Sequence, residues 1–181
     1  MTKELAGKVA IVTGAGRNIG RAIALALAEG GASVVVNARS NRPEADAVAR
    51  EIETAGGKAL VHIGDVADAV AVLAMADVTV KQFGRLDILV NNAALRREKP
   101  FAEMSYAAWR EILDVTLDGA FHCAKACLPG LRKSGAGTIV NIGGLSAHTG
   151  AKDRAHVVTA KAGIIGFTRR WPMTLPTTAS R

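Results

Sequence analysis

The chain has 181 residues, enough for one α/β domain with a buried core. Hydrophobic residues make up 49% of it and aromatic residues only 4%, which favours helices packed closely on a parallel sheet over a β-sandwich. The formal net charge is +7 at pH 7, but the basic residues are dispersed and lack an aromatic stacking motif. We therefore expect no nucleic-acid partner, although an excess of positive charge favours an anionic ligand.

No apolar run is long enough to span a membrane, and the first five residues lack the apolar core and cleavage pattern of a signal peptide. These features predict a soluble cytoplasmic protein without a membrane partner. Cys123 and Cys127 are four residues apart on an expected helix, and the four histidines are scattered. Because a metal site needs more ligands nearby, we expect no metal and interpret both cysteines as buried small hydrophobic residues.

Short β-branched runs alternate along the chain with longer alanine-rich stretches of helical periodicity. The expected strands are 9–12, 33–37, 59–63, 86–90 and 138–142. The expected helices are 19–28, 42–55, 67–83, 105–131 and one that begins near 155. Alternation with short connections implies right-handed crossovers and a parallel sheet. The pattern predicts a doubly wound, Rossmann-type α/β fold with one dinucleotide-binding domain over residues 1–169.

A glycine-bearing segment, Thr13-Gly14-Ala15-Gly16-Arg17-Asn18-Ile19-Gly20, lies between the first expected strand and the first expected helix. Glycines in this context permit a tight turn and close approach of the backbone to a pyrophosphate, which the N-terminus of the helix then stabilises. The alternative is a plain turn from strand to helix without a ligand.

This segment resembles the TGxxxGIG fingerprint of the short-chain dehydrogenases/reductases. Further landmarks follow in the order of that family: Asp65-Val66, Asn91-Asn92-Ala93-Ala94, the strand 139–142, and Lys161-Ala162-Gly163. The resemblance covers about residues 5–169 and is greatest to the 3-oxoacyl-carrier-protein-reductase branch. It implies hydride transfer between a nicotinamide cofactor and the carbonyl or hydroxyl of a small or acyl-type substrate. It also implies strand order 3-2-1-4-5 and a homo-oligomer.

The resemblance assigns cofactor contacts by position. Pyrophosphate contacts fall on Gly14, Gly16, Ile19 and Gly20, adenine contacts on Asp65 and Val66, and contacts to the nicotinamide ribose on Asn91, Ala93 and Lys161. Without the family, Asp65 is an ordinary turn or helix-cap residue, and Asn91 belongs to an ordinary turn. Asn18 and Ala94 replace glycines that are usual in the two loop motifs.

The end of the second expected strand indicates which nicotinamide cofactor is bound. An NAD site usually carries an acidic residue there, which accepts a hydrogen bond from the ribose hydroxyl. This chain has Arg39 and Ser40 instead, and Arg17 lies in the first turn. These residues predict binding of the 2′-phosphate of NADP in preference to NAD. The alternative is that both arginines are solvated surface residues.

The family's catalytic set is a tyrosine, a lysine four residues later, a serine and an asparagine. When the chain is aligned on Lys161, the tyrosine position holds Val157, the serine position Gly144 and the asparagine position Thr116. Only the lysine is retained. The sequence therefore predicts cofactor binding more strongly than turnover, and a protein that binds the cofactor without turning it over is an alternative.

Two neighbouring residues are candidate replacements. An imidazole suits proton transfer at neutral pH, so His156 is a candidate acid, although on a regular helix it lies about 140° around the axis from Lys161. Ser146 is two residues beyond Gly144 and could supply a hydroxyl from a loop. The alternatives are a solvated histidine and a serine that caps a helix or lies in a loop.

Residues 170–181 break the helical pattern with two prolines and a threonine run. If plausible codons are assigned to residues 170–180, the same bases read in the frame that starts one base earlier encode the peptide Ala-Leu-Ala-His-Asp-Leu-Ala-His-His-Gly-Ile. This peptide resembles the helical continuation of the family. We interpret this tail as an irregular segment from a one-base frameshift near codon 169, which truncates the family fold before its last two strands. A natural irregular tail is the alternative. On the frameshift interpretation, the chain could be an unstable fragment without a function of its own.

Overall fold

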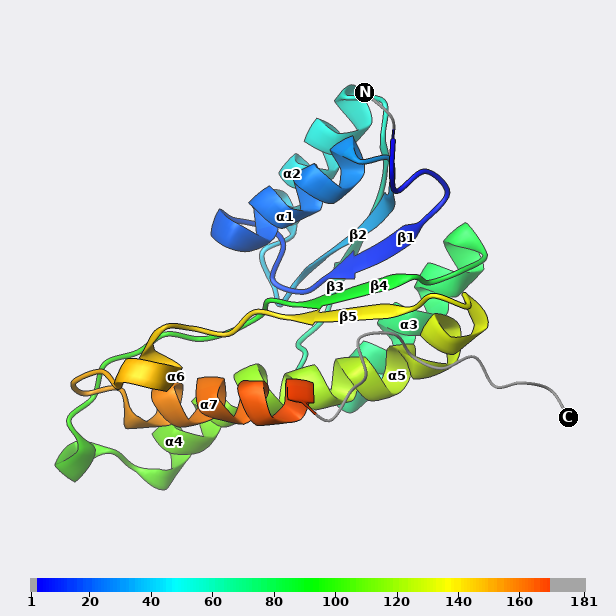
Figure 1. Cartoon of the computed structure of the whole chain (residues 1–181). Helices are drawn as coiled ribbons and strands as arrows, with labels where there is room; N and C mark the ends of the chain where they lie inside the picture. Colours follow the sequence, from blue (N-terminus) through cyan, green and yellow to red (C-terminus); the bar gives the residue numbers. More distant parts are fainter. Residues whose placement is uncertain (1–2, 170–181) are drawn as a thin grey trace, which may run out of the picture.

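The computed structural model describes residues 3–169, so the predicted irregular tail at 170–181 lies outside the described residues. Five parallel strands form one sheet in the order β3-β2-β1-β4-β5 (Figure 1). The strands are β1 (Val9–Val12), β2 (Ser33–Ala38), β3 (Lys58–Ile63), β4 (Ile88–Asn91) and β5 (Thr138–Asn141). The predicted fold class and strand order are confirmed.

Helices cover both faces of the sheet, as a doubly wound fold requires (Figure 1). On one face lie α1 (Asn18–Glu29) and α2 (Arg42–Thr54), and on the other lie α3 (Ala69–Phe83) and α5 (Gly119–Lys133). Further along the second side are α4 (Tyr106–Leu113), the short α6 (Ser146–Thr149) and α7 (Ala155–Arg169). The sequence did not predict α6 or the short 3-10 turn Phe101–Glu103.

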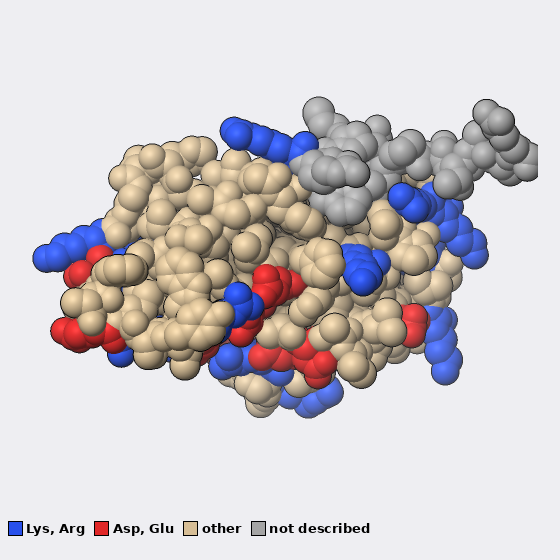
Figure 2. All heavy atoms as spheres, turned by 90° about the horizontal axis from the view of Figure 1, so that it is seen from below, with Lys and Arg blue, Asp and Glu red and all other residues tan. Residues whose placement is uncertain are grey.

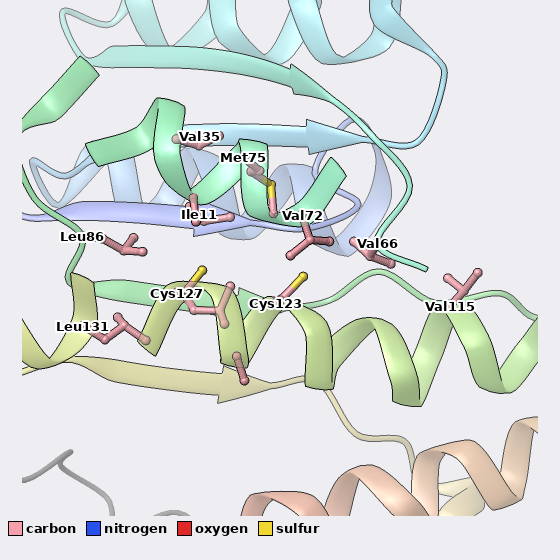
Figure 3. Close-up of a cluster of buried hydrophobic side chains, with 13 residues drawn as sticks. Ile11, Val35, Val66, Val72, Met75, Leu86, Val115, Cys123, Cys127 and Leu131 are labelled. Atoms are coloured by element: carbon pink, nitrogen blue, oxygen red, sulfur yellow. The ribbon is translucent and has the colours of Figure 1, made fainter. Parts of the chain in front are cut away.

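Alternate side chains of each strand enter two separate cores. Val12, Val34 and Val36 contact the first pair of helices, whereas Ile11 and Val35 point toward α3 and α5. Figure 3 shows the second core, in which Cys123 and Cys127 of α5 are fully buried beside Met75 and Leu131. The interpretation of both cysteines as core residues is confirmed, and burial raises the pKa of the Cys123 thiol to about 12.

Short polar side chains determine where several helices begin. The Asn41 side chain accepts a hydrogen bond from the Glu44 N–H at the start of α2 (3.3 Å). The Asp68 carboxylate accepts from the Val70 N–H at 2.8 Å. This cap starts α3 at Ala69, two residues later than the sequence predicted.

The long helix predicted over 105–131 is interrupted. A π-helical turn, η2 (Asp114–Asp118), separates α4 from α5. Arg110 forms ion pairs with both Asp114 and Asp118 across this turn. The extra residue of a π turn changes the face that the following helix presents, and such turns are common at functional sites.

Over residues 3–169, no helix combines the length and the apolar character needed to cross a membrane. In that same range, no three His, Cys, Asp or Glu side chains gather as metal ligands. On the face seen in Figure 2, blue basic side chains stand apart from one another, with red acidic ones among them. This view shows no continuous basic patch.

Asp87, just before β4, joins the amino-terminal ends of β1 and β4. Its buried carboxylate accepts hydrogen bonds from Arg85 Nη2 (2.6 Å), the Val9 N–H (3.0 Å) and Lys8 Nζ (3.3 Å). Burial by itself favours the neutral acid. The hydrogen bonds outweigh burial and hold the pKa of Asp87 below its ordinary value of 3.8.

Asp87→Asn is therefore expected to lower the free energy of unfolding by about 2 kcal/mol at pH 7, measured by urea denaturation. The carboxylate stabilises the fold fully above its ordinary pKa of 3.8, and this contribution is lost as the pH falls through the lowered folded-state pKa. The difference between wild type and variant should therefore shrink on acidification below about pH 4. A difference that stays constant on acidification would contradict the assignment.

Candidate cofactor and catalytic site

A cavity of about 770 Å³ opens at the carboxyl ends of the strands. It lies where the strand order reverses between β1 and β4, the usual ligand position in doubly wound folds, and its size is typical of small-molecule sites. Ten of the residues predicted to bind the cofactor line it: Gly14, Gly16, Arg17, Ile19, Gly20, Arg39, Ser40, Asp65, Val66 and Ala93.

The turn after β1 is held against the loop after β4. Asn92 Nδ2 donates hydrogen bonds to the carbonyl oxygens of Thr13 (2.9 Å) and Gly14 (3.1 Å). Thr13 Oγ1 in turn accepts from the N–H groups of Asn92 and Ala93, both at 3.0 Å. Thr13 and Asn92 belong to the two loop motifs of the sequence, but their connection of the two loops was not predictable from it.

Position 20 requires glycine because its Cα lies too close to neighbouring atoms to carry a side chain. A Cβ atom at this position would lie 2.2 Å from the Gly14 carbonyl oxygen and 2.5 Å from Asn92 Nδ2. Gly14 has φ +62°, a left-handed conformation that glycine adopts without strain. The first turn of α1 therefore lies directly against the loop, and its residues Asn18, Ile19 and Gly20 line the cavity.

Asn18, at the position where the family fingerprint has a glycine, adopts a backbone conformation that glycine favours. Its φ is +49°, in the left-handed region where asparagine is enriched among non-glycine residues. Asparagine is therefore compatible with the left-handed conformation at this position. Ala94, the other replaced glycine, is exposed and lines the cavity.

Asp65 and Asn91 differ in their relation to the cavity. Asp65 lines it, and one of its carboxylate oxygens accepts a hydrogen bond from the Ala67 N–H (3.0 Å), so it is also a turn residue. Asn91 is not among the lining residues. Its side chain is buried between β4, β5 and α5, where it donates to Asn141 Oδ1 at 2.8 Å and to the Ala120 carbonyl oxygen at 3.4 Å. Its contact with the nicotinamide ribose stays a prediction.

Basic side chains surround part of the cavity. Arg17 and Arg39 are exposed at its lining, and Arg96 and Arg97 from the loop after β4 join them. Arg97 forms a bidentate ion pair with Glu111 of α4, in which Nη2 donates to Oε1 at 3.0 Å and Nε donates to Oε2 at 3.3 Å. Arg96 and Arg97 were not predicted from the sequence, although an arginine pair one residue after a recognised loop motif was a usable signal.

Lys161, Gly144 and Ser146 lie together beyond the end of β5, outside the cavity lining. Lys161 on α7 is half-buried, its Nζ donates to the Ile142 carbonyl oxygen, and burial lowers its pKa. A Cβ atom on Gly144 would lie 3.6 Å from Lys161 Cγ and 3.8 Å from Ser146 Oγ. The structure therefore brings the retained lysine, the replaced serine position and the candidate replacement serine to one place.

The remaining catalytic positions are buried against α4 and η2. Val157 packs with Ile112 and Ala160 in a small apolar cluster. His156 is only 1% exposed, so its interpretation as a solvated residue is wrong, and it does not line the cavity. Thr116 lies in the π turn, and its buried hydroxyl has no hydrogen-bond partner among the described residues. None of these side chains lines the cavity, and the role of His156 as an acid stays a prediction.

Residues 8–179 match the family model for short chain dehydrogenases. The chain belongs to the short-chain dehydrogenase family. It is 40% identical over 162 residues to the 3-oxoacyl-[acyl-carrier-protein] reductase FabG of Staphylococcus aureus, which covers 90% of this chain and 66% of the relative. It is 41% identical over 165 residues to the 3-oxoacyl-[acyl-carrier-protein] reductase of Synechocystis, covering 91% of this chain and 67% of the relative.

A solved structure is similar over the same part of the chain. It is a protein assigned as a short-chain alcohol dehydrogenase from Sinorhizobium meliloti 1021, with a TM-score of 0.89 and 36% identity, covering 94% of this chain and 67% of that one. This chain therefore spans about two thirds of the length of the relatives that it matches. The resemblance stated from the sequence motifs is confirmed, and so is the oxidoreductase family that it implied.

Proposed function

We propose that this chain binds NADP(H) in the cavity and is an oxidoreductase that transfers hydride between NADP(H) and a carbonyl or hydroxyl compound. Its substrate would be a small molecule or an acyl-type compound, its location cytoplasmic and its assembly a homo-oligomer. The observation that carries the proposal is the glycine turn at the wall of the cavity, where Gly20 lies so close to Gly14 that no side chain fits between them. When bound, the cofactor would supply the hydride.

The residues present fit this cofactor. The turn from Gly14 to Gly20 and the N-terminus of α1 would hold the pyrophosphate, because backbone N–H groups and the helix dipole favour an anion there. Arg17, Arg39 and Ser40 would hold the 2′-phosphate. Asp65 would contact the adenine. Lys161 would contact the nicotinamide ribose, with its amine oriented by the Ile142 carbonyl.

Arg39→Ala is expected to weaken NADPH binding about tenfold or more and to leave NADH binding unchanged, because one charge-assisted hydrogen bond contributes about 1.5–3 kcal/mol. Calorimetric titration of both cofactors measures the two affinities. Arg50→Ala is the matched control, since Arg50 is equally exposed but does not line the cavity. An equal loss of affinity for NADPH and NADH would show that Arg39 does not bind the 2′-phosphate.

A second function is cofactor binding without turnover. It is favoured by the burial of Val157 at the tyrosine position and by Gly144 at the serine position, which leave Lys161 without the phenol and the hydroxyl of the family's catalytic set. With this function the protein would bind NADP(H) without oxidising or reducing it, and the complex of protein and cofactor would be the functional species. No proton donor comparable to the family's tyrosine would then be needed.

NADPH consumption separates the two functions. The oxidoreductase function predicts measurable oxidation of NADPH with at least one member of a panel of ketones and 3-oxoacyl thioesters, and loss of that oxidation in Lys161→Ala. Binding of NADPH without oxidation across the panel would overturn the first function and support the second. Absence of both binding and oxidation would overturn both.

A further inference from the structure

Asn37, near the end of β2, is a buried polar residue in the lining of the cavity. β1 and β2 pair as far as Val12 and Val36, so Asn37 comes directly after the last paired residue of β2 on that side. It is 2% exposed. A buried amide is unfavourable unless its polar groups are hydrogen-bonded. Asn37 must therefore form hydrogen bonds with the neighbouring segments.

The side chain of Asn37 forms hydrogen bonds with two other segments. Its Nδ2 donates to the carbonyl oxygens of His62 (3.2 Å) and Gly64 (3.0 Å), at the end of β3. Its Oδ1 accepts from the Gly14 N–H at 3.4 Å, in the turn after β1. These partners fix the orientation of the amide, because the reversed amide would place an oxygen against two carbonyl oxygens. Both amide hydrogens are used, so neither is left for a ligand.

The backbone of Asn37 makes a further connection to the same turn. Its carbonyl oxygen accepts a hydrogen bond from the Ala15 N–H at 2.7 Å. The N–H groups of Gly14 and Ala15, two consecutive residues of the glycine turn, are therefore both directed to Asn37. Asn37 thus joins three segments that are far apart in the sequence, namely the glycine turn, the end of β2 and the end of β3.

These three segments carry three parts of the proposed cofactor site. The glycine turn would hold the pyrophosphate. Arg39 lies two residues after Asn37 and would hold the 2′-phosphate. Asp65 directly follows Gly64 and would contact the adenine. One dinucleotide must contact all three parts at once, so its affinity depends on how the protein positions them relative to one another.

We infer that Asn37 is a positioning residue for the dinucleotide. Its hydrogen bonds fix the glycine turn relative to the ends of β2 and β3, at the separation that one NADP(H) molecule spans. It acts through these segments and not through a hydrogen bond that it donates to the cofactor. The inference rests on the proposed binding of NADP(H) and adds a residue that determines the geometry of that site.

Asn37→Leu tests this role, because leucine has the branched shape of asparagine but none of its hydrogen-bonding groups. In calorimetric titration of the intact chain, NADPH should bind at least about tenfold more weakly than to the wild type, the effect of losing one hydrogen bond to a charged ligand group. Inorganic pyrophosphate should keep its affinity within about twofold, because it contacts only the glycine turn, which Asn92 still holds. Asn37→Ala, which removes the hydrogen bonds without filling the space, should give the same pattern.

Asp87→Asn is the matched control, since Asp87 is a buried, hydrogen-bonded side chain at the opposite, amino-terminal end of the strands. It should lower the stability of the fold and leave both affinities unchanged. Thermal melting without ligand verifies that each variant is folded at the temperature of titration.

Three results would overturn the inference. The first is NADPH binding at wild-type affinity in a folded Asn37 variant. The second is an equal loss of affinity for NADPH and pyrophosphate, and the third is failure of both Asn37 variants to fold, since each would leave Asn37 a structural role alone. A wild-type chain that does not bind NADPH would overturn the proposed function, and this inference with it, so the two failures are distinguishable.

Discussion

Gly20→Ala is expected to reduce NADPH affinity about 100-fold, because the loss of one or two charge-assisted hydrogen bonds to the pyrophosphate, at about 1.5–3 kcal/mol each, has an effect of that size. The added Cβ would sit 2.2 Å from the Gly14 carbonyl oxygen and 2.5 Å from Asn92 Nδ2. Both contacts are far shorter than van der Waals distance, so α1 must move away from the loop after β4. That movement disrupts the backbone surface proposed to hold the pyrophosphate. Calorimetric titration with NADPH measures the loss.

The same variant should also lose about 1–3 kcal/mol of stability, as overpacked positions generally do. Gly166→Ala is the matched control, since its Cβ enters open space and should change neither NADPH affinity nor fold stability by much. Protein that stays folded and binds NADPH with wild-type affinity in Gly20→Ala would show that the glycine turn is not the phosphate site.

Val157→Tyr combined with Gly144→Ser is expected to raise NADPH-dependent ketone reduction about 100-fold, since a positioned general acid contributes roughly 10²–10⁴-fold. The tyrosine would lie one helical turn from Lys161, on the same face of α7. The protonated amine would stabilise the phenolate left after proton transfer. The serine Cβ would lie 3.6 Å from Lys161 Cγ, which leaves room for its hydroxyl.

This double variant is expected to be less stable than the wild type, because it adds volume to the apolar cluster around position 157. Tyrosine is larger than the valine that packs with Ile112 and Leu113, so a loss of about 1–3 kcal/mol is expected on thermal or urea unfolding. Thr159→Tyr with Gly144→Ser is the control, because the exposed position 159 lies on the opposite side of α7 from Lys161. An equal gain in the control, or no gain in folded Val157→Tyr with Gly144→Ser, would contradict the assignment of these positions.

Most of the fold could be predicted because its signals are local. Continuous runs such as Val9–Val12 predicted strands to within two residues, and apolar residues at helical spacing located the helices. The interruption of the long helix was not visible, because η2 preserves an apolar stripe while adding a residue to one turn. Strand order depended on the family resemblance, since strand pairing is not encoded in local periodicity.

The parts of the site that lie in one continuous segment of the sequence were predictable. The parts that form by contact between two distant segments were not. The glycine turn was identified from its own sequence and its place between strand and helix. Asn92 forms hydrogen bonds with Thr13 and Gly14, which precede it in the chain by 79 and 78 positions, and such side-chain hydrogen bonds leave no local signal in the sequence. The burial of His156 follows from contact between α7 and α4, which the helix pattern alone did not specify.

The central claim is that the cavity at the ends of β1, β2 and β4 binds NADP(H), with the 2′-phosphate held by Arg17 and Arg39. Parallel calorimetric titrations of the wild-type chain with NADPH and NADH test it most directly. The account predicts one cofactor per chain and binding of NADPH at least about tenfold tighter than NADH, the difference that one charge-assisted contact supplies. Equal affinities, tighter NADH or no binding of either cofactor would contradict it.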